Sequence, residues 1–166
     1  MGFITNDKEA FLFMREHLLN QMEKSISQDS ECTYRGYKQN LLDQLKDEAE
    51  TIAEHNGFYD EEDVEDVYID LLASHSPTLK CAVGALIIDT FYHQNLEGRV
   101  VSTTEEDIVH AVQKSNPLWK ITDMSISLMQ EFQNIHDRHE PSEWGFRTDR
   151  LFDRFDYYND YTGVPK

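Results

Sequence analysis

Acidic side chains crowd one part of this chain, between residues 43 and 75, where twelve carboxylates stand against one basic residue, Lys46. Within it, carboxylates recur every three or four residues along two segments that we expect to be helical, so they share one side of each helix. The first row is Asp43, Asp47, Glu50 and Glu54, and the second is Glu62, Asp66 and Asp70, with Glu61 and Glu65 beside it. Successive members are separated by about 6 Å along a helix axis, which resembles the spacing of a phosphate chain.

The chemistry that these rows suit is electrostatic recognition. Like charges one helical turn apart cost about 0.2 to 0.5 kcal/mol per pair, so helix stability does not explain them, and a solvated helix face normally mixes both signs of charge. We therefore predict an outward acidic surface, with Phe58 and Tyr59 beside it for specificity. We expect this surface to stand in for DNA or RNA phosphates and to dock in the cationic groove of a nucleic-acid-binding protein. The alternative, that the acids only keep the protein in solution, stays open.

The net charge of the whole chain, −17, narrows the classes of partner. A field of this sign repels nucleic acid and anionic membranes, so we expect neither to be bound directly, whereas it speeds encounter with a basic protein or nuclease. The most apolar run, Leu79 to Tyr92, is too short and too polar to span a bilayer. Two cysteines, Cys32 and Cys81, and the lack of a recognisable secretory signal predict a cytoplasmic location.

In size and charge the chain is similar to phage anti-restriction and anti-CRISPR proteins that mimic DNA. That similarity implies a non-catalytic inhibitor that works by occupying the nucleic-acid site of its target. An immunity protein or antitoxin that neutralises a basic nuclease toxin would need the same kind of surface. Under either interpretation we expect no catalytic residue, no metal and no cofactor.

A second resemblance points to metal chemistry instead. Asp47-x-x-Glu50 is followed by Glu62-x-x-Glu65, or in another register by Asp63-x-x-Asp66. These pairs resemble those of all-α nucleoside triphosphate pyrophosphatases of the MazG type, which place ExxE on one helix and ExxD on the next to hold Mg²⁺. Neither pair reproduces the family pattern letter for letter. The resemblance implies Mg²⁺-dependent hydrolysis of nucleoside triphosphates, for which the carboxylates would have to converge.

Other polar and aromatic residues carry weaker signals. His136 and His139 share one helix face, but two ligands do not make a zinc site. Asp89 and His93 lie one turn apart in an apolar segment, where we expect a buried acid satisfied by its neighbour. Residues 147–163 interleave arginines with aspartates and aromatic residues. This C-terminal segment is expected either to dock on the rest of the protein or to form a homodimer contact.

Apolar residues recur with a period close to 3.6 almost throughout the chain. This predicts an all-α fold, with residues 1–166 forming a single acidic domain built as a bundle of six or seven helices. The predicted helices cover about residues 8–25, 34–55, 60–72, 77–91, 104–114, 117–139 and 143–158. Asn56-Gly57 is the expected end of the second helix, and Asp60 is the expected cap of the third. The acid rows belong to these two helices.

Three finer expectations concern the other helices. Asp7 is the predicted N-cap of the first helix, and Met22 is predicted to lie on its buried face. The second helix is expected to begin at Tyr34. The helix that opens at Ser76-Pro77 is almost entirely apolar, which predicts that it is the central helix of the bundle.

Overall fold

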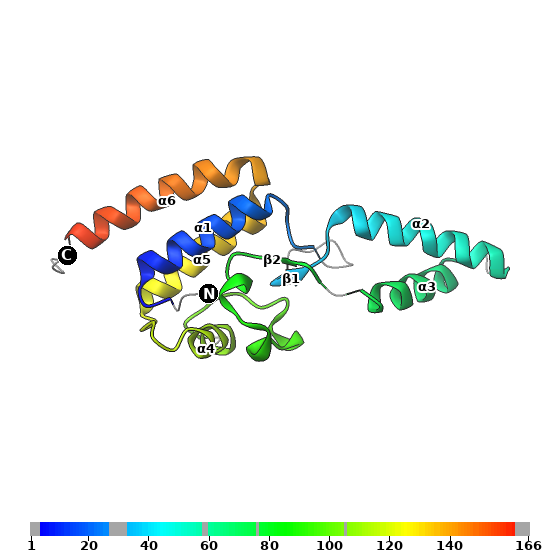
Figure 1. Cartoon of the computed structure of the whole chain (residues 1–166), viewed down its shortest axis with the longest axis horizontal. Coiled ribbons are helices and arrows are strands. Elements are labelled where there is room, and N and C mark those ends of the chain that lie inside the picture. Colours follow the sequence, from blue (N-terminus) through cyan, green and yellow to red (C-terminus); the bar gives the residue numbers. More distant parts are fainter. Residues whose placement is uncertain (1–3, 27–32, 58–59, 76, 105, 162–166) are drawn as a thin grey trace.

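The computed structural model describes residues 4–26, 33–57, 60–75, 77–104 and 106–161, the last six of these by their backbone only. Within these residues the protein has the predicted all-α fold, with six α-helices. They are α1 (Asp7–Gln21), α2 (Gln39–Asn56), α3 (Glu61–Ala73), α4 (Glu106–Ser115), α5 (Asp123–Arg138) and α6 (Pro141–Tyr161). The other elements are strands β1 (Arg35–Gly36) and β2 (Leu79–Lys80) and the 3-10 helices η1 (Gly84–Leu86), η2 (Asp89–Phe91) and η3 (Gln94–Leu96). Figure 1 shows that α2 and α3 form a hairpin that projects from a body made of the remaining helices.

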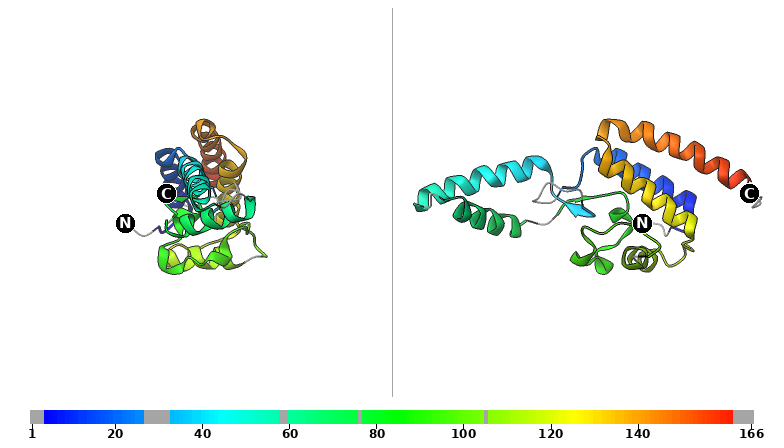
Figure 2. Two further views of the ribbon diagram at one scale, coloured as in Figure 1. Left: turned by 90° about the vertical axis from the view of Figure 1, so that its right-hand side faces the viewer. Right: turned by 180° about the vertical axis from the view of Figure 1, so that it is seen from behind.

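The body is built on a layer of α1, α5 and α6 around one apolar core. The ring of Phe11 on α1 packs edge-on against Phe132 of α5, with 5.1 Å between ring centroids, and lies 5.2 Å from Phe152 of α6. Trp119 and Trp144 are buried in the same core. The segment that contains the 3-10 helices, together with α4, lies on the side of the layer away from α6 (Figures 1 and 2). No described helix has both the length and the apolar character that crossing a membrane requires.

The hairpin owes its form to its two caps and to a small apolar core of its own. α2 ends at Gly57, whose φ of +80° suits a residue without a side chain, and the Gly57 N–H donates to the carbonyls of Ala53 and Glu54. Asp60 caps α3 by accepting a hydrogen bond from the Asp63 N–H at 2.9 Å. Both ends agree with the sequence prediction. The buried residues that join the two helices are Leu42, Leu45, Ala49, Tyr68 and Leu72.

Two paired strands join the hairpin to the body, and we call this region the junction. β1 leads into α2, β2 follows α3, and the strands pair antiparallel with Arg35 opposite Lys80. Glu97 accepts hydrogen bonds from the backbone N–H groups of Tyr34 and Arg35 at 2.8 and 3.1 Å. Asp89 bonds the side chains of Arg35 and Lys80 at 2.7 and 3.1 Å. The body therefore holds both strands at the point where the hairpin begins.

The prediction of a central helix over residues 77–91 is wrong. This segment instead holds β2, η1 and η2, and much of it is enclosed in the body core. The backbone of Tyr34 lies directly against Gly84, where a Cβ atom would come within 2.2 Å of the Tyr34 carbonyl oxygen. Burial on all sides removes the alternation by which an amphipathic helix is recognised, so an apolar run of this length does not specify its backbone conformation.

The prediction that Asp89 is buried beside His93 is also wrong. The Asp89 side chain is 79% exposed and starts the short helix η2. The hydrogen bond and charge of Lys80, followed by the charge of Arg35, hold the pKa of the Asp89 carboxyl below its usual range. Its role is to tie the two strands of the junction together.

The first helix differs in detail from its prediction at both ends. Asn6 caps α1 by accepting a hydrogen bond from the Glu9 N–H at 3.0 Å, and Asp7 is the first helical residue. The Asp7 carboxylate instead accepts from the indole N–H of Trp119 at 2.7 Å. Met22, expected to be buried, ends the helix with a φ of 49° and is exposed.

Two other helices begin later than predicted. Tyr34 belongs to the junction rather than to α2, because β1 precedes the helix. α5 begins at Asp123, since Thr122 supplies its cap and forms a reciprocal pair of hydrogen bonds with Ser125. The predicted ends of α3, α4 and α6 lie within a few residues of the observed ones.

Two glycines, Gly36 in the junction and Gly84 in η1 beside it, allow a direct test of the packing there. At Gly36 a Cβ atom would lie 2.5 Å from the backbone N and O of Ile26, and Gly84 meets Tyr34 in the same way. We expect Gly36→Ala and Gly84→Ala each to lower the free energy of unfolding by about 1 to 3 kcal/mol, because backbone atoms must move apart. Urea denaturation followed by circular dichroism measures this.

The matched control is Gly145→Ala in α6, where the nearest atom to a new Cβ is Leu19 Cδ2 at 3.7 Å. This change should raise stability by about 0.5 to 1 kcal/mol, since alanine favours a helix interior. A Gly84→Ala variant as stable as the wild type would contradict the close approach of the two backbones.

Candidate functional site

All nine acids of the two predicted rows are exposed on the hairpin. They are Asp43, Asp47, Glu50 and Glu54 on α2, and Glu61, Glu62, Glu65, Asp66 and Asp70 on α3. Their exposure follows from the packing of the helices, because the apolar residues of each helix turn toward the other helix and leave the carboxylates in solvent. The rows are therefore parts of one structural unit.

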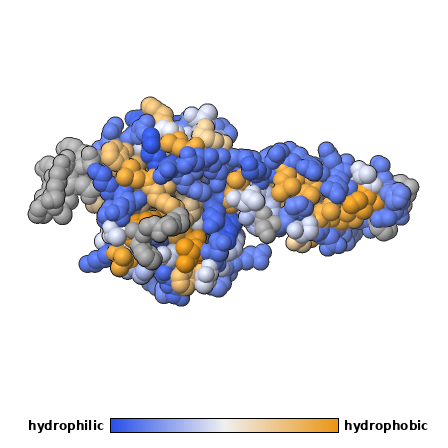
Figure 3. Space-filling model, viewed as in Figure 1, coloured by the Kyte–Doolittle hydropathy of each residue, from blue (hydrophilic) through white to orange (hydrophobic). Residues whose placement is uncertain are grey.

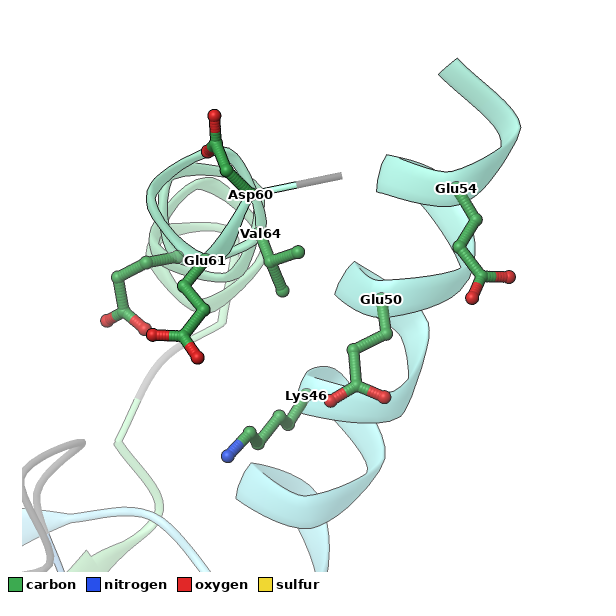
Figure 4. A pocket seen from close by; sticks show the side chains of 7 residues that line it. Lys46, Glu50, Glu54, Asp60, Glu61 and Val64 are labelled. Carbon is green, nitrogen blue, oxygen red and sulfur yellow. The ribbon is translucent and has the colours of Figure 1, made fainter. Parts of the chain in front are cut away.

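Four of these acids line one groove between α2 and α3, which we call the acidic groove. Its volume is about 580 Å³, and its lining residues are Lys46, Glu50, Glu54, Asp60, Glu61, Val64 and Glu65. Figure 4 shows Glu50 and Glu61 reaching from opposite helices into the space between them, with Val64 pointing across from α3. The groove is thus a negatively charged channel with one apolar wall residue.

The other predicted site residues have different positions. Asp43, Asp47, Glu62, Asp66 and Asp70 are exposed but do not line the acidic groove. Phe58 and Tyr59 lie outside the described residues.

Sequence reasoning missed Lys46, Asp60 and Val64 as groove residues. The signal for them was present in the tight connection at Gly57, since a short link between antiparallel helices places the last turns of α2 beside the first turns of α3. An explicit pairing of the two helices would have found all three.

No ion pair compensates the nine acids within the described part of the chain. Ion pairs in the body use the acids of the body, such as Arg15 with Asp149 at 2.6 Å and Arg154 with Glu131 at 3.3 Å. Lys46, the basic residue of the hairpin, also forms no ion pair among the described residues. Because neighbouring carboxylates of the hairpin lie within a Debye length of one another, their fields add at the surface.

Burial and the crowding of carboxylates act together on the pKa of Asp63. Partial burial raises the pKa of the Asp63 carboxyl above its usual range, and the negative charges of Asp60, Asp66 and Glu62 raise it further. A hydrogen bond with Asp60 acts in the same direction. A cation that approaches this end of α3 would therefore relieve an existing repulsion.

The carboxylate pairs that resemble the MazG-type pattern do not meet as pairs. Glu50 and Glu65 both line the acidic groove, whereas Asp47 and Glu62 are absent from its lining. Across the described ranges, no group of three or more His, Cys, Asp or Glu residues is placed to hold a metal ion. Mg²⁺ binding by these residues would need them to move together.

His136 and His139 also have separate roles. His136 is fully buried, with Nδ1 at 2.9 Å from Asp137 Oδ1, and its Nε2 accepts the Ser25 N–H at 3.3 Å. His139 lies 3.6 Å from a carboxylate oxygen of Glu143. Since both ring nitrogens of His136 are engaged, this residue ties α5 to the segment that runs from α1 toward the hairpin.

The C-terminal segment docks on the body as far as its side chains are described. Leu151 is buried, and Phe152 and Phe155 pack against the body core. α6 contacts both α1 and α5. The homodimer contact through the aromatic residues of this segment stays a prediction.

Comparison with protein-family models, with curated proteins and with solved structures finds no match to this chain. The chemistry of the hairpin must therefore be inferred from its own geometry and charge.

The raised pKa of Asp63 predicts an unusual dependence of stability on pH. When the pKa of a carboxyl is higher in the folded than in the unfolded protein, its protonation favours folding, so its contribution is present below the unfolded pKa of about 3.9 and is lost as pH rises through the folded pKa. Asp63→Asn should therefore stabilise the protein at neutral pH, and this advantage should vanish in acid. Urea denaturation at a series of pH values measures the difference.

Asp89→Asn is the opposing control for this test. The pKa of Asp89 is lowered by its neighbours, so this variant should be less stable than the wild type at neutral pH and should converge with it in acid. Equal stabilities of the wild type and Asp63→Asn at neutral pH would contradict carboxylate crowding at Asp63.

Proposed function

We propose that this protein is a non-catalytic inhibitor whose hairpin stands in for the phosphates of DNA or RNA. Its partner is a basic nucleic-acid-binding protein or nuclease, which binds the exposed carboxylates of α2 and α3 in place of its nucleic acid. One observation carries the proposal. All nine acids of the predicted rows are exposed, and none forms an ion pair with a cation within the described residues.

The charge density of the hairpin supports this proposal. α2 has 18 residues, which makes it about 27 Å long. Residues 39–73 carry twelve acids and one base, so the hairpin holds one net negative charge per about 2.5 Å of its length. Duplex DNA carries one charge per about 1.7 Å and a single strand one per about 3.4 Å. A cationic groove that accepts nucleic acid would meet a comparable charge density on the hairpin.

The rigidity of the hairpin also supports it. The carboxylates stand on two helices that share an apolar core, so little ordering is needed on binding. Ile69 is 42% exposed on α3, close in sequence to Glu65, Asp66 and Asp70, and offers a partner protein an apolar contact among the charges. Apolar contacts of this kind add specificity that charge alone does not provide.

Two related alternatives are distinguished by their partners or their chemistry. An immunity protein or antitoxin would use the same surface against a nuclease toxin, and the identity of the partner separates it from a phage inhibitor. A MazG-like hydrolase is favoured only by Glu50 and Glu65 lining the same groove. It predicts Mg²⁺-dependent turnover of nucleoside triphosphates that Asp47→Asn or Glu50→Gln abolishes.

The proposal is tested by capturing the partner and reversing the charge of the hairpin. Immobilised wild-type chain captures proteins from host lysate at low salt, a salt step elutes them, and gel shifts measure whether the chain displaces nucleic acid from each. We expect inhibition that weakens about tenfold or more between 50 and 200 mM salt. Glu62→Lys combined with Asp66→Lys should keep the fold and remove inhibition, because it replaces two negative charges by two positive ones on one side of α3.

Glu16→Lys combined with Asp153→Lys is the matched control, since both residues are exposed on the body and the change in net charge is the same. This variant should inhibit like the wild type. Unchanged inhibition by the hairpin variant would count decisively against the proposal. Equal loss in both variants would show that net charge acts, and not the hairpin.

A further inference from the structure

The hairpin has an apolar side that its own helices leave half covered. Leu41 and Ile52 on α2 and Val67 and Leu71 on α3 are all half-buried. Leu41, Val67 and Leu71 pack at the edge of the small hairpin core. Among the described elements, α2 and α3 pack chiefly on each other. Figure 3 shows apolar surface running along the hairpin.

Helical spacing places Leu41, Ile52 and Val67 away from the acidic groove. At about 100° per residue, Leu41 and Ile52 lie within about 20° of one another around α2 and about 160 to 180° from Glu50, a residue of the groove. On α3, Val67 lies about 160° from Glu65. Leu71 lies about 40° from Val67 and about 20° from Val64, a residue of the groove, so it stands at the edge nearest the groove. Leu41, Ile52, Val67 and Leu71 therefore form one continuous surface of the hairpin, which we call the apolar face.

Carboxylates lie at the apolar face on both helices. On α2, Glu48 is exposed between Leu41 and Ile52 along nearly the same line of the helix. On α3, Asp63 and Asp70 lie one turn before and one turn after Val67, the first half-buried and the second exposed. None of the three forms an ion pair within the described residues. An apolar face with carboxylates on both of its helices is complementary to a helix with an apolar strip flanked by basic residues.

The geometry also decides between possible occupants of the apolar face. A second copy of the chain would bring another hairpin with the same twelve acids and one base, and the two would repel each other. A basic helix would instead neutralise these carboxylates while it covers the apolar residues. Laid against α2 and α3, it would complete a three-helix bundle around the existing core.

We infer that the apolar face binds a basic amphipathic helix of the partner protein. Leu41, Ile52, Val67 and Leu71 contact the apolar strip of that helix, and the acids at the apolar face meet its lysines and arginines. This inference rests on the proposed function, since it names the element of the basic partner that the hairpin takes. It assigns that contact to the side of the hairpin away from the acidic groove.

The test compares two synthetic peptides of about 18 residues with identical Leu, Lys and Ala content, both able to form helices. In one the leucines form a single strip, and in the other they are spread around the helix. Fluorescence anisotropy measures their binding to the full-length protein at about 0.15 M salt. We expect the peptide with the leucine strip to bind about tenfold tighter or better. This comparison uses the wild-type protein and does not depend on the folding of a variant.

A variant then locates the contact. Ile52→Gln combined with Val67→Gln should bring the two affinities within about twofold of each other and leave the affinity of the other peptide unchanged. Leu118→Gln, at a residue 63% exposed on the body, is the matched control and should keep the tenfold preference. Circular dichroism reports whether each variant is folded.

Each other outcome separates this inference from the function on which it rests. Equal binding of both peptides to the wild type overturns the inference. Whether the hairpin mimics phosphates is then decided by the gel-shift test alone. A preference for the leucine strip, together with inhibition that survives charge reversal at Glu62 and Asp66, supports the apolar face and refutes phosphate mimicry. A dimer in sedimentation that Ile52→Gln with Val67→Gln abolishes would show a second copy on the apolar face and would also overturn the inference.

Discussion

The packing of α2 against α3 is the interaction on which the rest of the hairpin depends. Five buried residues hold together two helices that, with the cap residue Asp60, carry twelve acids and one base. Apolar contact therefore opposes electrostatic repulsion along the whole hairpin. The N-terminal acids of α3 recover part of this cost by facing the positive end of the helix dipole. The result is a polyanion with a fixed shape, which a flexible acidic tail could not provide.

The sequence predicts the two helices of the hairpin well because each of their signals is local. The apolar residues of α2 and α3 recur with the period of a helix, Gly57 stops one helix, and Asp60 caps the next. The same reasoning fails over residues 77–91, where the central residues 81–88 carry no charged or hydroxyl side chain and no helical period can be recognised. There the conformation is set by a distant partner, the backbone of Tyr34 against Gly84, and no local pattern reports that contact.

The acid rows could be predicted from the sequence, whereas the acidic groove and the apolar face could not. Exposure of the nine acids follows from helical periodicity alone, so their rows could be predicted one helix at a time. The acidic groove and the apolar face require knowing which sides of two helices meet. Lys46, Asp60 and Val64 take part in the groove only because α3 folds back along α2. Periodicity within each helix therefore identifies the charged residues but not the surfaces that the two helices form together.

The junction has a consequence for how such a protein can change. β1 and β2 hold the chain entering the hairpin beside the chain leaving it. The body is bonded to this region through Glu97 and Asp89. Everything between the two strands is thus an insertion whose ends already meet. Such an insertion can be lengthened, shortened or exchanged while the body keeps its sequence and its fold.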